Sequence, residues 1–442
     1  MFTKPDNWDE LSPDQRRTLR LDYWENAAEV SFDGPGEEQA YRDRIKVLRD
    51  AVELKKNPRV PAIPIIGRYI TQRAGLSGLD NLYHHEKLLQ PILGFHKEFQ
   101  PDVFVTSGPL PGKVWDILDY KVYAWAGHGL DASQQFQTID GEYMKADEYQ
   151  ALIRDPSGFW LKHYLPRVLG AMTPLKHMYN LPSITEIGAI GSAALPFGIP
   201  EVQEMLHKLM QAGNEAMKCF AFAREVGMGL EAAGFPAFMG PPFASAPFDM
   251  IGDVLRGTHG MMTDLHRRPA EVIEACERLV PIITRHIIDT CDQLGRAFVA
   301  FPLHKGADAF MSDRQFQTFY WPTLRAVLEA LNEEGITPLL FAEGSYTRRL
   351  EIIADYPRGR AIWFFDQTDM QRAREILGGH LCVMGNVPSS LMIVPDIDRL
   401  REYCGHLLEL FADTGGFILA NGAVIDNTTD EHVRTLIEVV RQ

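Results

Sequence analysis

From residue 297 to the C-terminus the chain alternates short apolar runs with longer amphipathic segments, and this alternation constrains the fold more than any other feature. The apolar runs have the length of strands and are Ala297–Leu303, Thr337–Phe341, Ala361–Phe365, Leu381–Gly385 and Gly416–Ala420. The segments between them have the periodicity of helices. A strand, a helix and a second strand in this order predict a parallel sheet, because the helix carries the chain back across the sheet.

Three more segments are strand candidates: Arg59–Ile66, Pro101–Thr106 and a stretch around Ala232–Met239. With the five C-terminal runs they bring the expected number of strands to eight. The simplest solution is an α/β fold in which the strands close into a (β/α)8 TIM barrel. Periodicity alone also allows an open, doubly wound sheet.

Helix starts can be read from a hydroxyl residue followed three positions later by Gln or Glu. This capping-box pattern occurs at Ser312, Thr368 and Thr428. In such a box the hydroxyl accepts a hydrogen bond from the third helical amide. The three positions therefore predict the starts of three of the C-terminal helices.

The length of 442 residues would suggest three domains at roughly 150 residues each, but a single barrel already uses about 250. Residues 1–58 are charged and rich in helix formers, so we expect an N-terminal helical extension. Residues 59–442 are then one barrel domain, and the irregular stretch at about 107–200 is a set of inserted loops.

Charge and cysteine content exclude several classes of protein. Lys and Arg number 44 against 59 Asp and Glu, a net charge of −15, which disfavours a nucleic acid or a membrane surface as partner. The five cysteines contain no CxxC pair, so neither a disulfide framework nor a ribbon-type zinc site is indicated. No apolar run is long enough for a leader or a membrane span. We expect a soluble cytoplasmic protein that binds a small molecule and forms either a monomer or a homodimer.

Polar residues follow the predicted strands, where the side chains of a barrel converge on its carboxyl-terminal mouth. They are His304, Lys305, Glu343, Tyr346, Asp366, Asn386 and Asn421. Several of these residues also have a purely structural interpretation. Asn386 is typical of a turn, and His304 and Lys305 are compatible with a solvated loop. Glu343 lies between an apolar run and a glycine, where a buried carboxylate needs a partner or a function.

The segment Gly234–Gly260 combines Phe, Met and Pro with a few polar residues. Flexible apolar side chains of this kind suit the wall of a pocket for an aromatic ligand. The candidate residues are Phe238, Met239, Asp249, Arg256 and His259. The alternative is barrel core with Asp249 as a helix cap.

Several motifs over residues 297–442 occur in a familiar order. They are Met311-Ser312-Asp313 with Phe316 and Tyr320-Trp321-Pro322, then Phe341-Ala342-Glu343-Gly344, Thr368-Asp369, Gly385-Asn386-Val387, Gly415-Gly416-Phe417-Ile418-Leu419 and Thr429-Asp430. In these motifs the chain resembles the uroporphyrinogen decarboxylase superfamily, which includes methyltransferases that exchange methyl groups with a corrinoid. The resemblance implies a (β/α)8 barrel with its pocket at the mouth.

Departures from the family motifs narrow the function that the resemblance implies. At the position of the decarboxylase aspartate stands Gly108, and at that of a late histidine stands Ala423, which disfavours decarboxylation of a porphyrinogen. The zinc-dependent methyltransferases have His-x-Cys and a further Cys where this chain has Phe341, Glu343 and Ala423. A zinc site of that kind is therefore disfavoured, although Glu343 with His304 or His259 is a possible set of metal ligands.

The resemblance and the strand-end residues together predict a methyltransferase or O-demethylase. It would move a methyl group between a small methoxylated or methylated substrate, aromatic in view of the Phe and Met residues, and a corrinoid carried on a separate protein. The candidate catalytic residues are Glu343, His304 and His259, and the candidate substrate-binding residues are Asp249, Arg256, Phe238, Met239, Lys305, Tyr346, Asn386 and Asn421.

Two other functions stay open. One is a decarboxylase or lyase acting on a carboxylated ring, with His304, Lys305 and Arg256 binding the carboxylate. The other is a non-catalytic binding subunit.

Overall fold

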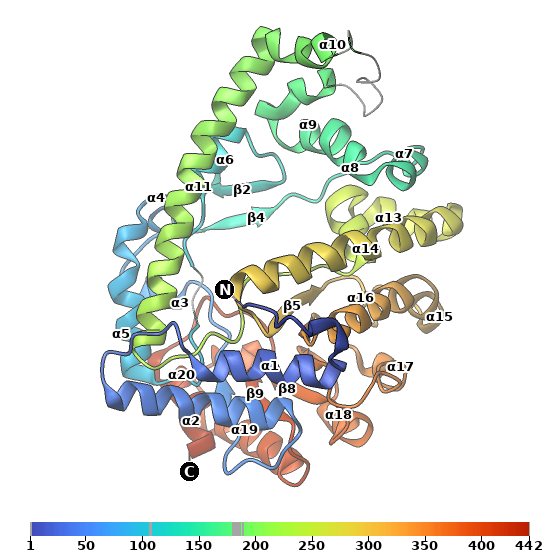
Figure 1. Ribbon diagram of the computed structural model, residues 1–442. Helices are drawn as coiled ribbons and strands as arrows, with labels where there is room; N and C mark the ends of the chain where they lie inside the picture. The colour runs from blue at the N-terminus through green and yellow to red at the C-terminus, as the bar shows by residue number, and fades with distance from the viewer. Residues whose placement is uncertain (1, 106–107, 179–186, 188–189, 442) are drawn as a thin grey trace.

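A parallel sheet of six strands forms the centre of the molecule in the computed structural model, which describes residues 2–105, 108–178, 187 and 190–441 (Figure 1). The strand order is β1-β9-β8-β7-β6-β5, and each neighbouring pair is parallel. The strands are β1 (Ala62–Ile63), β5 (Phe298–Leu303), β6 (Thr337–Ala342), β7 (Ile362–Phe365), β8 (Cys382–Val387) and β9 (Phe417–Asn421). The predicted α/β class with a parallel C-terminal sheet is thus confirmed.

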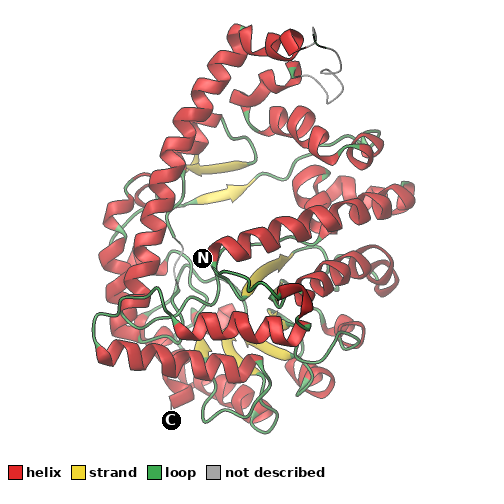
Figure 2. Cartoon of the chain, viewed as in Figure 1, coloured by secondary structure: helices red, strands yellow, loops and turns green. Residues whose placement is uncertain are grey.

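Helices connect these strands and cover the outer face of the sheet (Figure 2). They are α14 (Pro269–Leu294), α16 (Trp321–Glu333), α17 (Leu350–Ile353), α18 (Met370–Leu377), α19 (Ile397–Phe411) and α20 (Asp430–Glu438). Alternate strand residues such as Val299, Phe301 and Leu303 pack in one core with them. Phe298 and Leu339, on the other face of the sheet, belong to a second core. A strand buried on both faces has to be apolar throughout, which is the pattern of these runs.

Between the edge strands β1 and β5 the sheet loses its regularity. The predicted strands Pro101–Thr106 and Ala232–Met239 are not strands among the described residues, and Thr106 itself lies outside them. Isolated hydrogen bonds run through this region instead: Asp102 N–H donates to the Ala62 carbonyl at 3.4 Å and Phe104 N–H to the Pro236 carbonyl at 3.1 Å. Closure of the sheet into a full barrel therefore stays a prediction.

The N-terminal segment crosses the amino-terminal end of the sheet with α1 (Pro13–Asn26) and α2 (Pro35–Val52) (Figure 1). Trp24 of α1 packs edge-on against Phe298, the first residue of β5, with ring centroids 5.1 Å apart. Its indole N–H donates to the Ala237 carbonyl at 2.8 Å. The N-terminal helices thus cover the end of the sheet opposite to the strand-end polar residues.

A separate lobe precedes β5 and lies at the top of Figure 1. It contains α6 (Gly112–Leu118), a small sheet of β2 (Tyr123–Ala126), β3 (Gly129–Leu130) and β4 (Phe136–Thr138), then α7 (Tyr149–Arg154), α8 (Pro156–Phe159), α9 (Leu165–Val168) and α10 (Ile190–Ala194). The long helix α11 (Pro200–Ala232) leads from this lobe down one side of the molecule. The sequence pattern predicted only irregular loops here, because strands of two to four residues and helices of four to seven residues are too short to show a period. Residues 107, 179–186 and 188–189 of the predicted insertion lie outside the described residues.

The remaining helices are short or flank the site. They are α3 (Tyr69–Arg73), α4 (Gly78–Tyr83), α5 (Leu89–Phe99), α12 (Pro247–Asp249), α13 (Gly257–Arg267) and α15 (Asp313–Gln315), with π-helical turns at Trp160–Tyr164, Met250–Leu255 and Phe316–Tyr320. Short 3-10 helices lie at Trp8–Glu10, His85–Lys87, Gly170–His177, Leu195–Gly198, Thr347–Arg349, Ser389–Met392 and Val439–Arg441.

The capping predictions were right once and displaced by one residue twice. Ser312 caps α15 in a full capping box with Gln315. At α18 the cap is Asp369, and at α20 it is Thr429. Thr368 instead accepts a hydrogen bond from the amide of Tyr346 at 2.9 Å. A cap needs its oxygen near the third helical amide, and a neighbouring Asp or Thr meets that need equally well.

No helix of the described residues combines the length and the apolar character needed to cross a membrane.

Candidate active site at the carboxyl ends of the strands

The strand register brings three polar residues into one row at the carboxyl end of the sheet. Leu303 of β5 pairs with Ala342 of β6, and Ala342 pairs with Phe365 of β7. The next residue of each strand is therefore His304, Glu343 and Asp366. Because side chains alternate along a strand, these three lie on the face opposite to Leu303, Ala342 and Phe365, which pack against the helices. We call these three residues, with Asp253 and Lys305, the strand-end cluster.

His304 is held between two carboxylates. Its Nδ1 atom lies 2.7 Å from Oδ2 of Asp253, and its Nε2 atom lies 3.5 Å from Oε1 of Glu343. The hydrogen bond to Asp253, followed by the contact with Glu343, raises the pKa of His304 to about 10. The imidazole is therefore a cation at neutral pH, with an N–H available on each nitrogen.

Lys305 and Asp253 complete the cluster. The ammonium group of Lys305 lies 2.6 Å from Oδ1 of Asp253 and donates to the Thr258 hydroxyl at 3.2 Å. Burial acts to raise the pKa of Asp253, but the hydrogen bonds from His304 and Lys305 outweigh it, so the pKa is lowered. Asp253 is thus an anion shared by two cations, one of which also faces Glu343.

Asp249 fixes the backbone that carries the two cations. Its carboxylate accepts hydrogen bonds from the amides of His304 at 3.1 Å and Lys305 at 3.0 Å, and from the Tyr320 hydroxyl at 2.7 Å. The side chain is 1% exposed. Burial, followed by the nearby charge of Asp253, raises the pKa of Asp249 to about 6. Both carboxylate oxygens are engaged in the interior, so Asp249 positions the main chain of His304, and its role toward a substrate stays a prediction.

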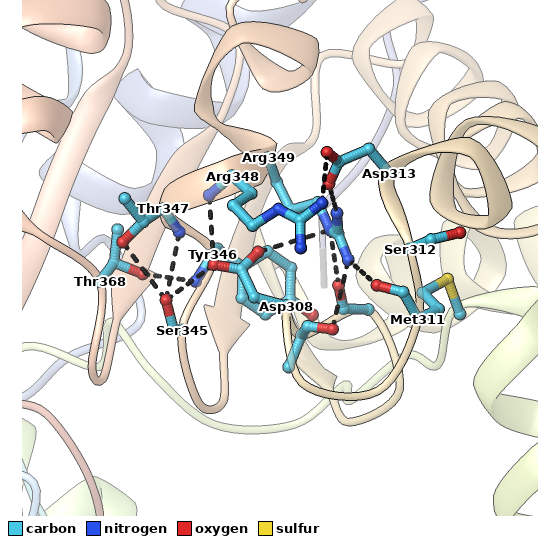
Figure 3. Close-up of polar contacts among 12 residues, drawn as sticks. Asp308, Met311, Ser312, Asp313, Ser345, Tyr346, Thr347, Arg348, Arg349 and Thr368 are labelled. Atoms are coloured by element: carbon cyan, nitrogen blue, oxygen red, sulfur yellow. Dashed lines mark hydrogen bonds and ion pairs between the residues drawn. The ribbon is translucent and has the colours of Figure 1, made fainter.

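A second network joins the loop after β5 to the loop after β6 (Figure 3). The buried guanidinium of Arg349 donates to the carbonyls of Gly306, at 3.2 Å, and Met311 and contacts the carboxylate of Asp313. Asp308 accepts from the Ser345 hydroxyl at 2.8 Å and lies 3.6 Å from Arg349. These contacts hold the loop that begins at His304 against the loop that begins at Glu343.

Glu343 is not buried, so the expectation of a buried carboxylate at this position was wrong. Its side chain is 42% exposed, because β6 ends at Ala342 and Glu343 is the first residue beyond the strand. Asp366 beside it accepts from the amide of Gly344 at 3.0 Å. Burial raises the pKa of Asp366.

Three predicted substrate-binding residues have structural contacts. Asn386 donates to the carbonyls of Asp366 and Thr368 and accepts from Tyr403. Asn421 is fully buried and joins β9 to the main chain of Ile65 through both of its amide atoms. Tyr346 is fully buried, and its hydroxyl donates to the Leu303 carbonyl at 3.3 Å. All three support the loops around the cluster, and their roles toward a substrate stay predictions.

Arg256 and His259 lie beside the cluster rather than in it. Arg256 is 3% exposed and forms 2.6 Å ion pairs with Asp264 and Glu142, which tie α13 to the lobe. His259 is exposed on α13, next to Thr258. Thr258 connects this helix to Lys305.

Phe238 and Met239 lie away from the cluster. They line a small recess with Trp24 and Phe298 at the start of β5, and the rings of Phe238 and Phe298 are 4.9 Å apart. This is the amino-terminal end of the strand, so these residues have the core role that was the alternative for their segment.

Sequence reasoning missed Asp253, Tyr320 and Arg349. Asp253 follows Asp249 by four residues, a spacing that places two side chains on one face of a helical turn, and this was the available signal. Tyr320 lies in the Tyr320-Trp321-Pro322 motif and Arg349 lies in no motif, and nothing in the local sequence of either residue tells which buried partner it meets.

The residues of the cluster do not fit a zinc site. Within the described part of the chain, no three His, Cys, Asp or Glu side chains are grouped so that they could hold a metal ion. The cluster supplies one histidine and no cysteine, whereas zinc sites commonly combine several Cys or His ligands.

Comparisons with known proteins agree with the motif order. Residues 231–442 match the family model described as uroporphyrinogen decarboxylase (URO-D). A uroporphyrinogen decarboxylase of Protochlamydia amoebophila (strain UWE25) is 29% identical over 133 residues, which are 30% of this chain and 35% of that relative. This chain thus aligns with only about a third of the relative's length.

The fold also resembles a solved structure, a methyltransferase from Methanosarcina mazei, with a TM-score of 0.55 and 14% sequence identity. The similarity covers 89% of this chain and 97% of that one, and at this identity it concerns the fold alone. The resemblance to the uroporphyrinogen decarboxylase superfamily that the motifs predicted is therefore confirmed by the match over residues 231–442.

Proposed function

We propose that the protein is an enzyme that moves a methyl group from a small methoxylated aromatic compound to a corrinoid carried on a separate protein. The observation that carries the proposal is the position of His304, a protonated imidazole at the carboxyl end of the sheet between Asp253 and Glu343. The fold similarity to a methyltransferase supports the reaction class.

Removal of a methyl group from an aryl ether breaks the bond between oxygen and methyl carbon. The methyl group leaves without the bonding electron pair, which stays on the oxygen as an aryloxide. A phenol such as that of tyrosine has a pKa of about 10, close to the pKa of about 10 of His304. Proton transfer from the imidazolium to the aryloxide is then nearly balanced in free energy, which is favourable for general acid catalysis.

The other cluster residues act through His304. Asp253 keeps it protonated, Asp249 fixes its main chain, and Glu343 lies where a substrate oxygen would approach Nε2. The corrinoid of the partner would supply the acceptor for the methyl group. No step is assigned to zinc, because the described residues do not fit such a site.

The proposal is tested by mixing the purified protein with a reduced corrinoid protein and a series of methoxybenzenes, and by following methylcorrinoid formation from its absorption spectrum. We expect transfer with the wild type and a loss of at least about 100-fold for His304→Gln, the usual contribution of general acid catalysis. Glu343→Gln should lower the rate, and exchange of the exposed Asp398 for Asn should not. Absence of transfer with every methoxybenzene, or an unchanged rate in His304→Gln, would reject the assignment.

A decarboxylase is the second candidate, favoured by the name of the curated relative and by the adjacent cations His304 and Lys305. The two cations would bind a carboxylate, and His304 would give a proton to the carbon from which carbon dioxide leaves. Release of labelled carbon dioxide from a panel of carboxylated rings, in the absence of methyl transfer, would select this function.

A further inference from the structure

Two phenylalanines flank β5 on the face that carries His304. In the register of β5 and β6, Phe341 pairs with Pro302. On the other side of β5, Phe243 is bridged to Ala300, with the amide of Ala244 donating to the Ala300 carbonyl at 2.8 Å. Residues paired in parallel strands project to the same face, so both rings share the face of Ala300, Pro302 and His304.

Both rings are accessible to solvent, Phe243 largely and Phe341 in part. Phe243 is 64% exposed. Phe341 is partly buried, and one side of its ring stacks on the fully buried Phe364, with centroids 4.4 Å apart and planes at 16°. Phe364 thus fixes the orientation of an aromatic surface that remains partly open. At the level of the two phenylalanines, the strand between them carries an alanine, Ala300, and a proline, Pro302, on this face.

We propose that Phe243 and Phe341 bind the aromatic ring of the substrate on either side, with its oxygen substituent directed toward His304. This inference rests on the proposed function and specifies its substrate. The backbones of the two phenylalanines are two strand spacings apart across the sheet, roughly 10 Å, and are offset by two residues, about 7 Å, along it. Stacked aromatic centroids lie about 4.5 to 7 Å apart. A single ring therefore fits between them, and His304 lies two residues beyond Pro302, about 7 Å along the strand.

The charges of the strand-end residues His304, Glu343 and Asp366 restrict the substituents that the aromatic ring of the substrate can carry. His304 offers an N–H to an oxygen, whereas Glu343 and Asp366 are carboxyl groups in the same row. Like charges would repel a ring that carries several carboxylates. The ligand class is thus a planar ring with a neutral oxygen substituent, such as a phenol or an aryl methyl ether.

The test measures binding without turnover, by saturation-transfer NMR titration of the full chain with methoxybenzene and with methoxycyclohexane, which has the same oxygen but no aromatic ring. The wild type should bind methoxybenzene more tightly than methoxycyclohexane. Phe243→Leu and Phe341→Leu should each weaken methoxybenzene binding roughly 3- to 10-fold, the usual effect of one aromatic contact. Phe341→Tyr keeps the ring and should bind as the wild type does. Phe197→Leu replaces a phenylalanine of similar exposure, 45%, in the separate lobe and should have no effect.

Each other result would overturn the inference. It fails if the wild type binds methoxybenzene no more tightly than methoxycyclohexane or binds neither, if the two leucine variants bind as the wild type does, or if Phe197→Leu weakens binding equally. Should Phe341→Leu fail to fold, Phe243→Leu and Phe341→Tyr decide the question. Ring binding that depends on both phenylalanines in a protein without methyl transfer would reject the proposed function and leave the ring site in place. Methyl transfer by the protein, together with leucine variants that bind methoxybenzene as the wild type does, would support the proposed function and reject the ring site.

Discussion

The Nδ1 atom of His304 lies 2.7 Å from the Oδ2 atom of Asp253, although 51 positions separate the two residues in the chain. One follows strand β5 and the other lies in the π-helical turn Met250–Leu255. The contact makes His304 a cation at neutral pH, and the proposed chemistry depends on that charge.

Replacement of Asp253 by Asn should lower the pKa of His304 from about 10 toward the ordinary histidine value of about 6.5. The carboxylate is the largest cause of the raised pKa, and an amide of the same shape removes its charge. NMR titration of the imidazole protons measures the pKa directly. Asp398→Asn, at a side chain that is 89% exposed on α19, is the matched control. An unchanged His304 pKa in Asp253→Asn would contradict the role of the contact.

The same raised pKa predicts how stability depends on pH. The folded protein binds the proton of His304 up to a pH of about 10, whereas the unfolded chain loses it near 6.5. The stabilisation is fully present below pH of about 6.5 and is lost as the pH rises through about 10. Urea denaturation of the wild type and of His304→Gln between pH 6 and 10.5 should give a difference in unfolding free energy that shrinks as the pH rises. A constant difference would show that the raised pKa does not stabilise the fold.

Asp249 should also stabilise the fold less as the pH rises, which is opposite to the usual behaviour of a carboxyl group whose pKa is lowered by folding. Its pKa in the folded protein is about 6, above the unfolded value of about 3.9. Between these values only the folded protein holds the proton, so this group stabilises the fold less as the pH rises from about 4 to about 6. Asp249→Asn lacks the ionisation and, by disturbing buried hydrogen bonds, should cost about 1 to 3 kcal/mol. Unfolding free energies at pH 4, 5, 6 and 7 should show the wild type losing its advantage over the variant along this series, and an advantage that grows would refute the prediction.

Arg349 and Arg348 are neighbours in sequence and differ in environment. Arg349 is fully buried among carbonyls and contacts Asp308 and Asp313, whereas Arg348 is 57% exposed and meets only Asp313 among the ion pairs of the described residues. Arg349→Met should lower the unfolding free energy by about 3 kcal/mol, since it leaves buried partners uncompensated. Arg348→Met should cost clearly less than Arg349→Met, because an ion pair at the solvent-exposed surface contributes little to stability. Equal losses in chemical denaturation would mean that the network in Figure 3 does not stabilise the two loops.

Much of the fold could be predicted because strands buried on both faces must be apolar and must alternate with helices. All five C-terminal strands lie within two residues of their predicted bounds. The same reasoning could not predict that the segments near Phe104 and Pro236 form no regular strand. Their main chain makes only isolated hydrogen bonds, while their composition is as apolar as that of a regular strand.

The site was predictable in part. His304, Lys305 and Glu343 follow strands, and the parallel register alone brings their positions together. In the segment Gly234–Gly260 sequence reasoning chose Phe238, which lies at the amino-terminal end of the sheet, whereas Phe243 of the same segment is bridged to Ala300 on the face of His304. The alternation of residues predicts which face of a sheet a side chain lies on. In a segment that forms no regular strand, it does not predict whether the side chain lies near the amino-terminal or the carboxyl-terminal end of the sheet.

The amino-acid sequence by itself determined the parallel sheet, the helices between its strands and the row of polar residues at the strand ends, because hydrophobic periodicity and capping are local properties. The tertiary structure decided which of those residues are charged, covered or open. Asp253 and Asp249 contact His304 from a segment some fifty residues earlier in the chain. The exposure of Glu343 depends on which distant segments of the chain cover the end of its strand. Burial and pairing over such separations arise only when the chain has closed upon itself, and no local pattern encodes them.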